Sequence, residues 1–141
     1  MAEVNLLKFV TEHIFLVALA VVSGGMLIWP VLRRSTGGPS ISTLQATLLI
    51  NQQNALVLDV REAAEYEKGH VLNARHLALG ELAARFGEIE KYKAKPVIVV
   101  CDSGNRSDKA VAALRKQGFT QVVSLQGGIG AWQQAGLPVE K

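Results

Sequence analysis

Two patterns of hydrophobic and polar residues divide this chain of 141 residues. Residues 14–32 form one apolar stretch without a charged side chain, whereas residues 41–141 alternate between short apolar runs and amphipathic segments. As a helix, the first stretch has a length of about 28 Å, which matches the hydrocarbon core of a bilayer. The pattern predicts one transmembrane helix near the N-terminus, followed by a separate domain.

The flanks of the apolar stretch decide between a membrane anchor and a cleaved signal peptide. A signal peptide has a basic start and a small-residue cleavage site. Here the start carries Glu3 and Glu12 besides Lys8, and the stretch ends in Pro-Val-Leu followed by Arg33 and Arg34. We therefore expect residues 1–34 to form an anchor region that is retained.

Positive charge near the span predicts its orientation. Arg33 and Arg34 follow the span directly, whereas Lys8 precedes it. Because positive charges are retained on the cytoplasmic side, this bias places the C-terminal domain in the cytoplasm. We expect a single-pass protein of the inner (cytoplasmic) membrane, in contact with the lipid bilayer through its N-terminal helix.

The remaining residues have the alternation of an α/β domain. Residues 35–40 include Gly37, Gly38 and Pro39 and are expected to be a linker, and residues 41–141 are enough for one core. Strands are expected at 55–60, 74–78, 96–100 and 121–125. Helices are expected at 62–68, 80–91, 107–117 and 129–135, and after Ser42 with Leu44, Thr47, Leu48 and Ile50 as the apolar face. Apolar strands that alternate with helices indicate a parallel sheet covered on both faces.

Composition excludes some classes of function. The formal net charge is +3, and the basic residues are scattered with few aromatic residues between them, so the sequence does not favour nucleic-acid binding. The three histidines and the single cysteine are too dispersed for a metal site. One cysteine excludes an internal disulfide and is typical of a reducing compartment.

Cys101 is that cysteine, and it begins the segment that carries the candidate chemistry. It ends the apolar run of residues 96–100 and is followed by Asp102, Ser103, Gly104, Asn105, Arg106 and Ser107. A helix is expected to begin near Ser107, with its positive dipole end toward the loop. Gly104 allows backbone amides to converge, and Arg106 adds a cation, so the loop favours a thiolate at Cys101.

Two observations weigh against this interpretation of Cys101. Asp102, next to the thiol, disfavours a thiolate and would repel a dianionic substrate. A lone cysteine at the end of a core strand is also often a small buried apolar residue without a function. The sequence Gly-x-Arg-Ser at a strand-to-helix junction favours the nucleophile, on the expectation that Asp102 points to water.

Five ordered motifs resemble the rhodanese-like sulfurtransferases. The loop Cys101-x-x-Gly104-x-Arg106-Ser107 is similar to their active-site loop. The other four motifs are Leu58-Asp59-Val60-Arg61-Glu62, the run EYEKGHV from Glu65, the strand KPVIVV from Lys95, and Gln126-Gly127-Gly128 with Trp132. The resemblance covers about residues 41–139. The order of one span and one such domain is similar to the membrane-anchored rhodaneses of bacteria.

The resemblance implies a fold and a mechanism. The fold is a parallel sheet of about five strands flanked by helices. Cys101 would take the outer sulfur of thiosulfate or a persulfide and pass it to a thiol or cyanide, without a metal or organic cofactor. Arg106 would order the loop and help to bind an anionic donor, Asp59 and Arg61 would support the site, and His70 would anchor a loop. The expected partners are small sulfur donors and thiol acceptors, and the sequence names no protein partner.

Two alternatives to sulfur transfer remain. Cysteine phosphatases also place a cysteine and an arginine around an anion, but their loop has one more residue than the four that separate Cys101 from Arg106. That spacing favours sulfur over phosphate. The second alternative is a membrane-tethered binding module without turnover, because fold alone does not establish function.

Overall fold

An N-terminal helical unit and a C-terminal α/β unit make up the chain. The computed structural model describes residues 5–35, 38–102 and 105–141. The units comprise Met1–Thr36 and Gly37–Lys141. The first unit contains α1 (Leu6–Glu12) and α2 (Ile14–Ser35).

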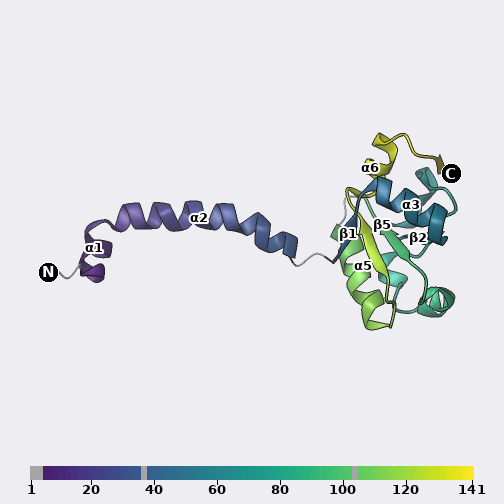
Figure 1. Cartoon of the computed structure of the whole chain (residues 1–141), viewed down its shortest axis with the longest axis horizontal. Coiled ribbons are helices and arrows are strands. Elements are labelled where there is room, and N and C mark those ends of the chain that lie inside the picture. The colour runs from purple at the N-terminus through teal and green to yellow at the C-terminus, as the bar shows by residue number, and fades with distance from the viewer. Residues whose placement is uncertain (1–4, 36–37, 103–104) are drawn as a thin grey trace. The chain divides into compact units, whose positions relative to one another are not determined.

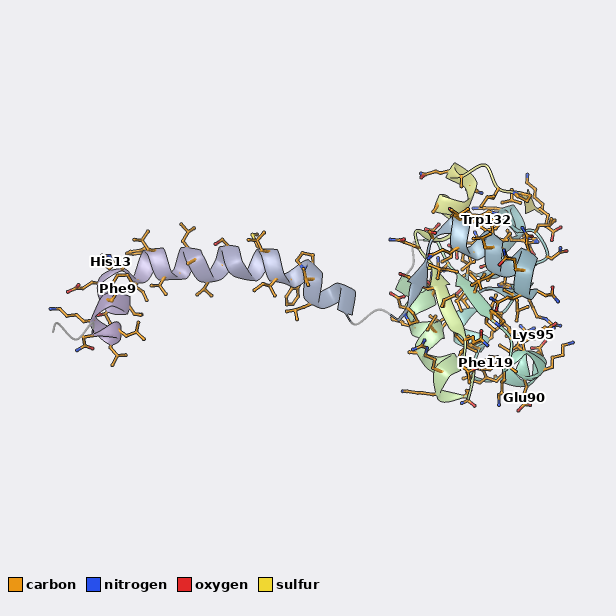
Figure 2. All side chains as sticks on the ribbon, viewed as in Figure 1. Phe9, His13, Glu90, Lys95, Phe119 and Trp132 are labelled. Atoms are coloured by element: carbon orange, nitrogen blue, oxygen red, sulfur yellow. The ribbon has the colours of Figure 1, made fainter. Side chains whose placement is uncertain are left out.

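Helix α2 contains the predicted span. Its stretch Ile14–Leu32 has a mean hydropathy of 2.3, and none of it is buried within the described chain. Apolar side chains stand out from α2 on all sides (Figure 2). By length and composition this helix is able to cross a membrane.

The second unit is built on a parallel sheet of five strands (Figure 1). The strand order is β1 (Ser40–Ile41), β6 (Val122–Leu125), β5 (Val97–Val100), β2 (Leu56–Asp59) and β4 (Arg75–His76). Strands β2 and β5 pair in parallel, and Asp59 of β2 lies opposite Val100 of β5. The carboxyl ends of β2 and β5 therefore meet at one edge, and the predicted α/β class is confirmed.

Helices cover both faces of the sheet because successive residues of each strand point to opposite sides. Val97 and Val99 of β5 pack on one side in a cluster with α5 (Asn105–Lys116). Ile98 and Val100 pack on the other side, with α3 (Thr43–Gln53) and α6 (Gly128–Gln134). Phe119 and Trp132 belong to these two clusters, respectively, and lie toward different ends of the unit (Figure 2).

Local sequence signals account for the ends of two helices. Ser42 Oγ accepts a hydrogen bond from the N–H of Gln45 at 3.3 Å, and the Gln45 side chain accepts from the N–H of Ser42 at 3.0 Å, which forms a capping box. At the end of α5, Gly118 has a φ of +97°, and the N–H of Phe119 reaches the carbonyl of Leu114. This left-handed glycine stop is the one that the sequence predicted.

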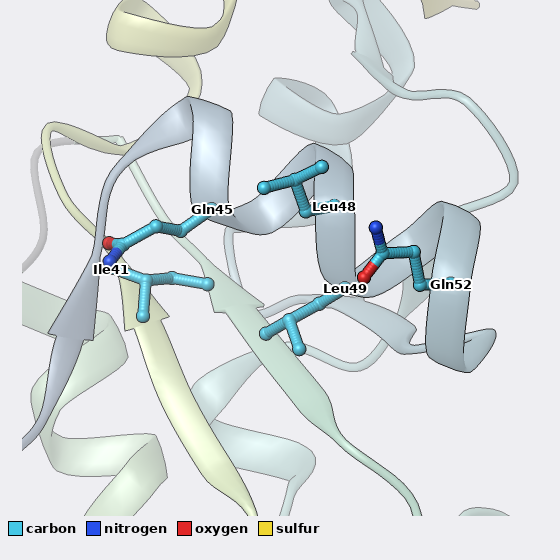
Figure 3. Close-up of a pocket in the computed structure, with 5 residues that line it drawn as sticks. All are labelled: Ile41, Gln45, Leu48, Leu49 and Gln52. Carbon is cyan, nitrogen blue, oxygen red and sulfur yellow. The ribbon is translucent and has the colours of Figure 1, made fainter.

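The predicted apolar face of α3 is wrong at Leu44 and Leu48, which are 69% and 46% exposed, whereas Ala46 is fully buried. The helix turns Ala46, Leu49 and Ile50 toward the sheet, and of these only Ile50 belonged to the predicted face. Figure 3 shows the result, a shallow groove of about 330 Å³ between α3 and β1, lined by Ile41, Gln45, Leu48, Leu49 and Gln52. None of these residues belongs to the predicted site.

The predicted helix over residues 80–91 is also wrong. The segment forms three single 3₁₀ turns, Leu79–Glu81, Phe86–Glu88 and Glu90–Tyr92. Gly87 lies at its middle, where glycine costs an α-helix about 1 kcal/mol. Turns with i→i+3 hydrogen bonds still bury Leu82 and Ile89. The sequence therefore predicted the buried positions of this segment correctly, but not its backbone conformation.

Three short strands lie outside the predicted elements. Ser40, at the end of the predicted linker, pairs with Ser124 of β6 as part of β1. His70 and Val71 form β3, which pairs antiparallel with β7 (Val139–Glu140). Strands of two residues have no period, so the sequence carries no signal for them. The ribbon β3–β7 holds the C-terminal segment beside the end of α4 (Ala63–Lys68).

Candidate active site

Cys101 lies directly after β5, in the middle of the sheet. It continues the face of Val97 and Val99 and is 1% exposed. Its Sγ is 3.5 Å from Oγ of Ser107, which is itself buried. A serine hydroxyl both donates and accepts, so Ser107 accepts from a thiol and donates to a thiolate. Ser107 is therefore positioned to stabilise either form of the sulfur.

The first turn of α5 carries three of the predicted site residues. The helix begins at Asn105 rather than near Ser107, so Asn105, Arg106 and Ser107 are helical. The connection from β5 to α5 is only four residues long, 101–104, so α5 begins close to Cys101 in the sequence. The positive dipole end of a helix lies at its first turn, so that of α5 faces this connection.

The predicted loop also includes Asp102, Ser103 and Gly104. Asp102 is exposed, which fits the expectation that its carboxylate meets water. Ser103 and Gly104 lie outside the described residues.

Gly128 supports the cysteine from the side of α6. Its φ is +59°, and a Cβ on it would lie 2.2 Å from the carbonyl oxygen of Cys101 and 2.6 Å from that of Asp102. The N–H of Ile129 donates to the Cys101 carbonyl at 2.9 Å. The sequence identified the Gly127-Gly128 pair but not its structural role. At Gly128 the backbone of α6 approaches that of Cys101 so closely that a side chain would not fit.

Arg106 forms a bidentate ion pair with Glu65 of α4. The two terminal guanidinium nitrogens donate to the two carboxylate oxygens at 2.7 and 2.8 Å. Glu65 also accepts from the N–H of Glu62 at 2.9 Å. The hydrogen bonds from Arg106, and then that from Glu62, lower the pKa of Glu65 to about 2. Glu65 therefore stays ionised at neutral pH and holds Arg106 in place.

The ion pair with Glu65 changes the role expected for Arg106. Hydrogen bonding to Glu65, and next the negative charges of Glu65, Cys101 and Asp102, raise the pKa of Arg106. Arg106 is thus electrostatically coupled to the cysteine, but its fork of donors faces Glu65. Sequence reasoning did not include Glu65 among the site residues, although it begins the EYEKGHV motif.

Asp59 and Arg61 form a buried ion pair beside the site. Asp59 is fully buried and Arg61 is 5% exposed. The guanidinium donates to the carboxylate at 2.7 and 3.0 Å and to the carbonyl of Gly69 at 2.7 Å. A buried charge needs this degree of pairing to be tolerated. The pair fastens the end of β2, next to β5, to the end of α4.

The rings of His70 and His76 both stack on the ring of Tyr66. The ring centroids of His70 and His76 lie 3.7 and 4.6 Å from that of Tyr66. His70 Nδ1 is 2.9 Å from the carbonyl oxygen of Tyr66, and Nε2 is 3.4 Å from the Glu140 carboxylate. His70 thus links α4 to the C-terminal strand β7. Among the residues that the structure describes, no group of three or more His, Cys, Asp or Glu side chains is placed to hold a metal ion.

A family model for the rhodanese-like domain matches residues 42–135, most of the α/β unit. The chain belongs to the rhodanese-like family. The resemblance inferred from the five motifs is therefore confirmed, and so is the rhodanese-like fold.

The chain is similar in sequence to bacterial relatives. It is 42% identical over 96 residues to the Escherichia coli protein YibN, an alignment that covers 67% of each protein. It is 38% identical over 100 residues to the thiosulfate sulfurtransferase GlpE of Actinobacillus pleuropneumoniae, covering 71% of this chain and 91% of that protein. These likenesses support an activity of the sulfurtransferase type.

Solved rhodanese structures share the fold. A rhodanese-related protein of Thermoplasma volcanium superposes with a TM-score of 0.63 at 35% identity, over 73% of this chain and 98% of that one. The rhodanese domain of this chain thus corresponds to nearly the whole of that protein.

Proposed function

We propose that this rhodanese carries sulfane sulfur as a persulfide on Cys101 and transfers it to a thiol or cyanide acceptor. The observation that carries the proposal is the position of the Cys101 sulfur, 3.5 Å from the hydroxyl of Ser107 in the first turn of α5. A thiolate there is stabilised by a hydroxyl donor and by a helix dipole. Membership of the family supplies the reaction class.

The transfer takes place in two displacements at sulfur. The Cys101 thiolate attacks the outer sulfur of thiosulfate or of a thiol persulfide; the S–S bond of the donor breaks, and sulfite or a thiolate leaves with the electron pair. An acceptor thiolate or cyanide then attacks the outer sulfur of the Cys101 persulfide and restores the Cys101 thiolate. Neither step changes the net oxidation state of the reactants, so no metal or organic cofactor takes part.

The other site residues have supporting roles in this proposal. Asp102 is turned to water, and Ser107 is hydrogen-bonded to Cys101. Arg106 orders the loop through Glu65, and the Asp59–Arg61 pair supports the neighbouring strand end.

Sulfur loading of the intact chain tests this function. The full chain in detergent, incubated with thiosulfate or with cysteine persulfide, is expected to gain the mass of one sulfur atom on the peptide that contains Cys101. A reducing thiol should remove the added sulfur and itself become a persulfide, which is turnover. If neither donor adds sulfur, the sulfurtransferase function is wrong and a binding module without turnover takes its place.

We further propose that the N-terminal region anchors the domain on the cytoplasmic face of the bacterial inner membrane. Arg33 and Arg34 after the apolar stretch, against Lys8 before it, support this orientation. A periplasm-specific reporter fused after Lys141 is expected to be inactive, and a cytoplasm-specific reporter to be active. The reverse result, or release of the domain from membranes by cleavage after the span, would contradict the proposal.

A further inference from the structure

The charge of Arg106 is already compensated within the protein. Both of its terminal nitrogens donate to Glu65, and both side chains are about one-third exposed, at 33% and 34%. A bidentate arginine–carboxylate pair neutralises the positive charge of the guanidinium, although N–H donors remain on its other edges. A bound anion would therefore meet a cation whose charge Glu65 already compensates.

Other nearby charges are mostly negative. Asp102 follows Cys101 directly and is exposed. Helix α4 carries Glu65 and Glu67 against one Lys68, and Glu62 is the residue that caps it. Arg61, a further cation near Glu65, is paired with Asp59. Asp102 and Cys101 both raise the pKa of Arg106, as expected of negative charges close to it. A donor that brings two negative charges to Cys101 therefore meets carboxylates and a cation that is already paired.

We propose that Glu65 is a specificity-determining residue, which by holding Arg106 directs the site toward thiol persulfides and away from thiosulfate. This inference rests on the proposed sulfur transfer and names its donor class. In thiosulfate the leaving sulfite carries two negative charges, whereas a thiol persulfide leaves as a thiolate with one. The site thus discriminates against thiosulfate because Glu65 already compensates the charge of Arg106, and not because of its shape.

The reaction with this donor class is balanced without another reactant. The Cys101 thiolate attacks the terminal sulfur of R–S–SH, the S–S bond between the inner and the terminal sulfur breaks, and the electron pair leaves on R–S⁻. Cys101 becomes Cys–S–SH, and the proton equilibrates with solvent. Glu65 does not touch the reacting sulfur atoms; it acts through Arg106.

The substitution Glu65→Gln isolates the charge of this residue. Glutamine at the third position of a helix still accepts from the N–H of the capping residue, so the hydrogen bond from Glu62 can be kept. The guanidinium of Arg106 loses its carboxylate and becomes available to a substrate anion. We expect the ratio of kcat/KM for thiosulfate to kcat/KM for cysteine persulfide to rise roughly tenfold, the value of one charge-assisted contact.

Glu67→Gln is the matched control. It removes the same charge from the same helix, at an exposed position that does not pair with Arg106. It should change the ratio by less than about twofold, since exposed charges are screened by solvent and salt. The double variant Glu65→Gln/Arg106→Gln should lose the gain, because the gain depends on the freed guanidinium. Damage to the fold alone would lower both rates and would not raise the thiosulfate rate.

The outcomes separate this inference from the function on which it rests. If cysteine persulfide loads Cys101 but Glu65→Gln leaves the ratio unchanged, or Glu67→Gln raises it equally, the role of Glu65 is overturned and sulfur transfer stands. A wild-type chain that loads faster from thiosulfate than from cysteine persulfide also overturns it, without need of a variant. If no donor loads the wild-type chain or the variant, both proposals are overturned.

Discussion

The Cys101→Ser chain is expected to take up no sulfur from any donor and to show no turnover, while its domain remains folded. A serine oxygen cannot form the persulfide on which both displacements depend. The smaller hydroxyl fits the same buried position and can hydrogen-bond to Ser107, which lies 3.5 Å from the present sulfur. The expected change in the free energy of unfolding is therefore about 1 kcal/mol, within the range of ordinary single substitutions.

Intact mass after incubation with each donor, together with circular dichroism on heating, measures both parts of this prediction. The wild-type chain treated in parallel is the control. Because the sequence contains one cysteine, a reversible sulfur adduct that persists in the variant would contradict a covalent carrier at Cys101. Loss of loading together with loss of the folded state would leave the serine chain uninformative as a test of chemistry, and alanine at the same position would then replace it.

The second large effect is expected at Gly128. Alanine there would place its Cβ 2.2 Å from the Cys101 carbonyl oxygen, so the backbone that carries the nucleophile must move. The strained φ and the displaced packing each cost about 1–3 kcal/mol. We expect Gly128→Ala to lower the free energy of unfolding by about 3 kcal/mol. We also expect it to slow sulfur loading roughly 100-fold, because catalysis is sensitive to misplacement on the scale of 1 Å.

Two other glycines provide matched controls for this effect. Gly136 has a similar φ of +70°, and no atom lies within 4 Å of a Cβ placed on it, so Gly136→Ala reports the backbone strain alone. Gly130, in the same helix as Gly128, also has open space around its Cβ and should accept alanine without loss. Guanidinium unfolding and loading rates of the three variants give the comparison. Equal loading rates for Gly128→Ala and Gly136→Ala would show that the close approach to Cys101 has no role in the reaction.

Much of the fold was accessible from local sequence patterns. The apolar runs that become β2, β5 and β6 are strand-length and buried, and they alternate with helical segments, so they predict a parallel sheet. The cap at Ser42 and the glycine stop at Gly118 depend on contacts within five residues. These features are predictable because the residues that cause them are neighbours in the sequence.

The failures occurred where the signal is not local. Leu44 and Leu48 have helical spacing, but the sheet buries Ala46 and Leu49 instead, so the face of α3 depends on what packs against it. The segment 80–91 has apolar residues at helical intervals and forms 3₁₀ turns. Strands as short as β1, β3 and β7 exist only because longer-range partners supply their hydrogen bonds.

The same division applies to the candidate site. By itself the sequence determined an apolar span, a parallel α/β sheet and a cysteine at the end of one of its strands, since periodicity and strand-to-helix order depend on adjacent residues. That this strand is the middle one of the sheet came from the structure. The tertiary structure alone decided that Arg106 pairs with Glu65, 41 positions away, and that Gly128 lies against the Cys101 carbonyl. Such contacts depend on how the strands and helices pack together, which brings distant segments to hydrogen-bonding distance.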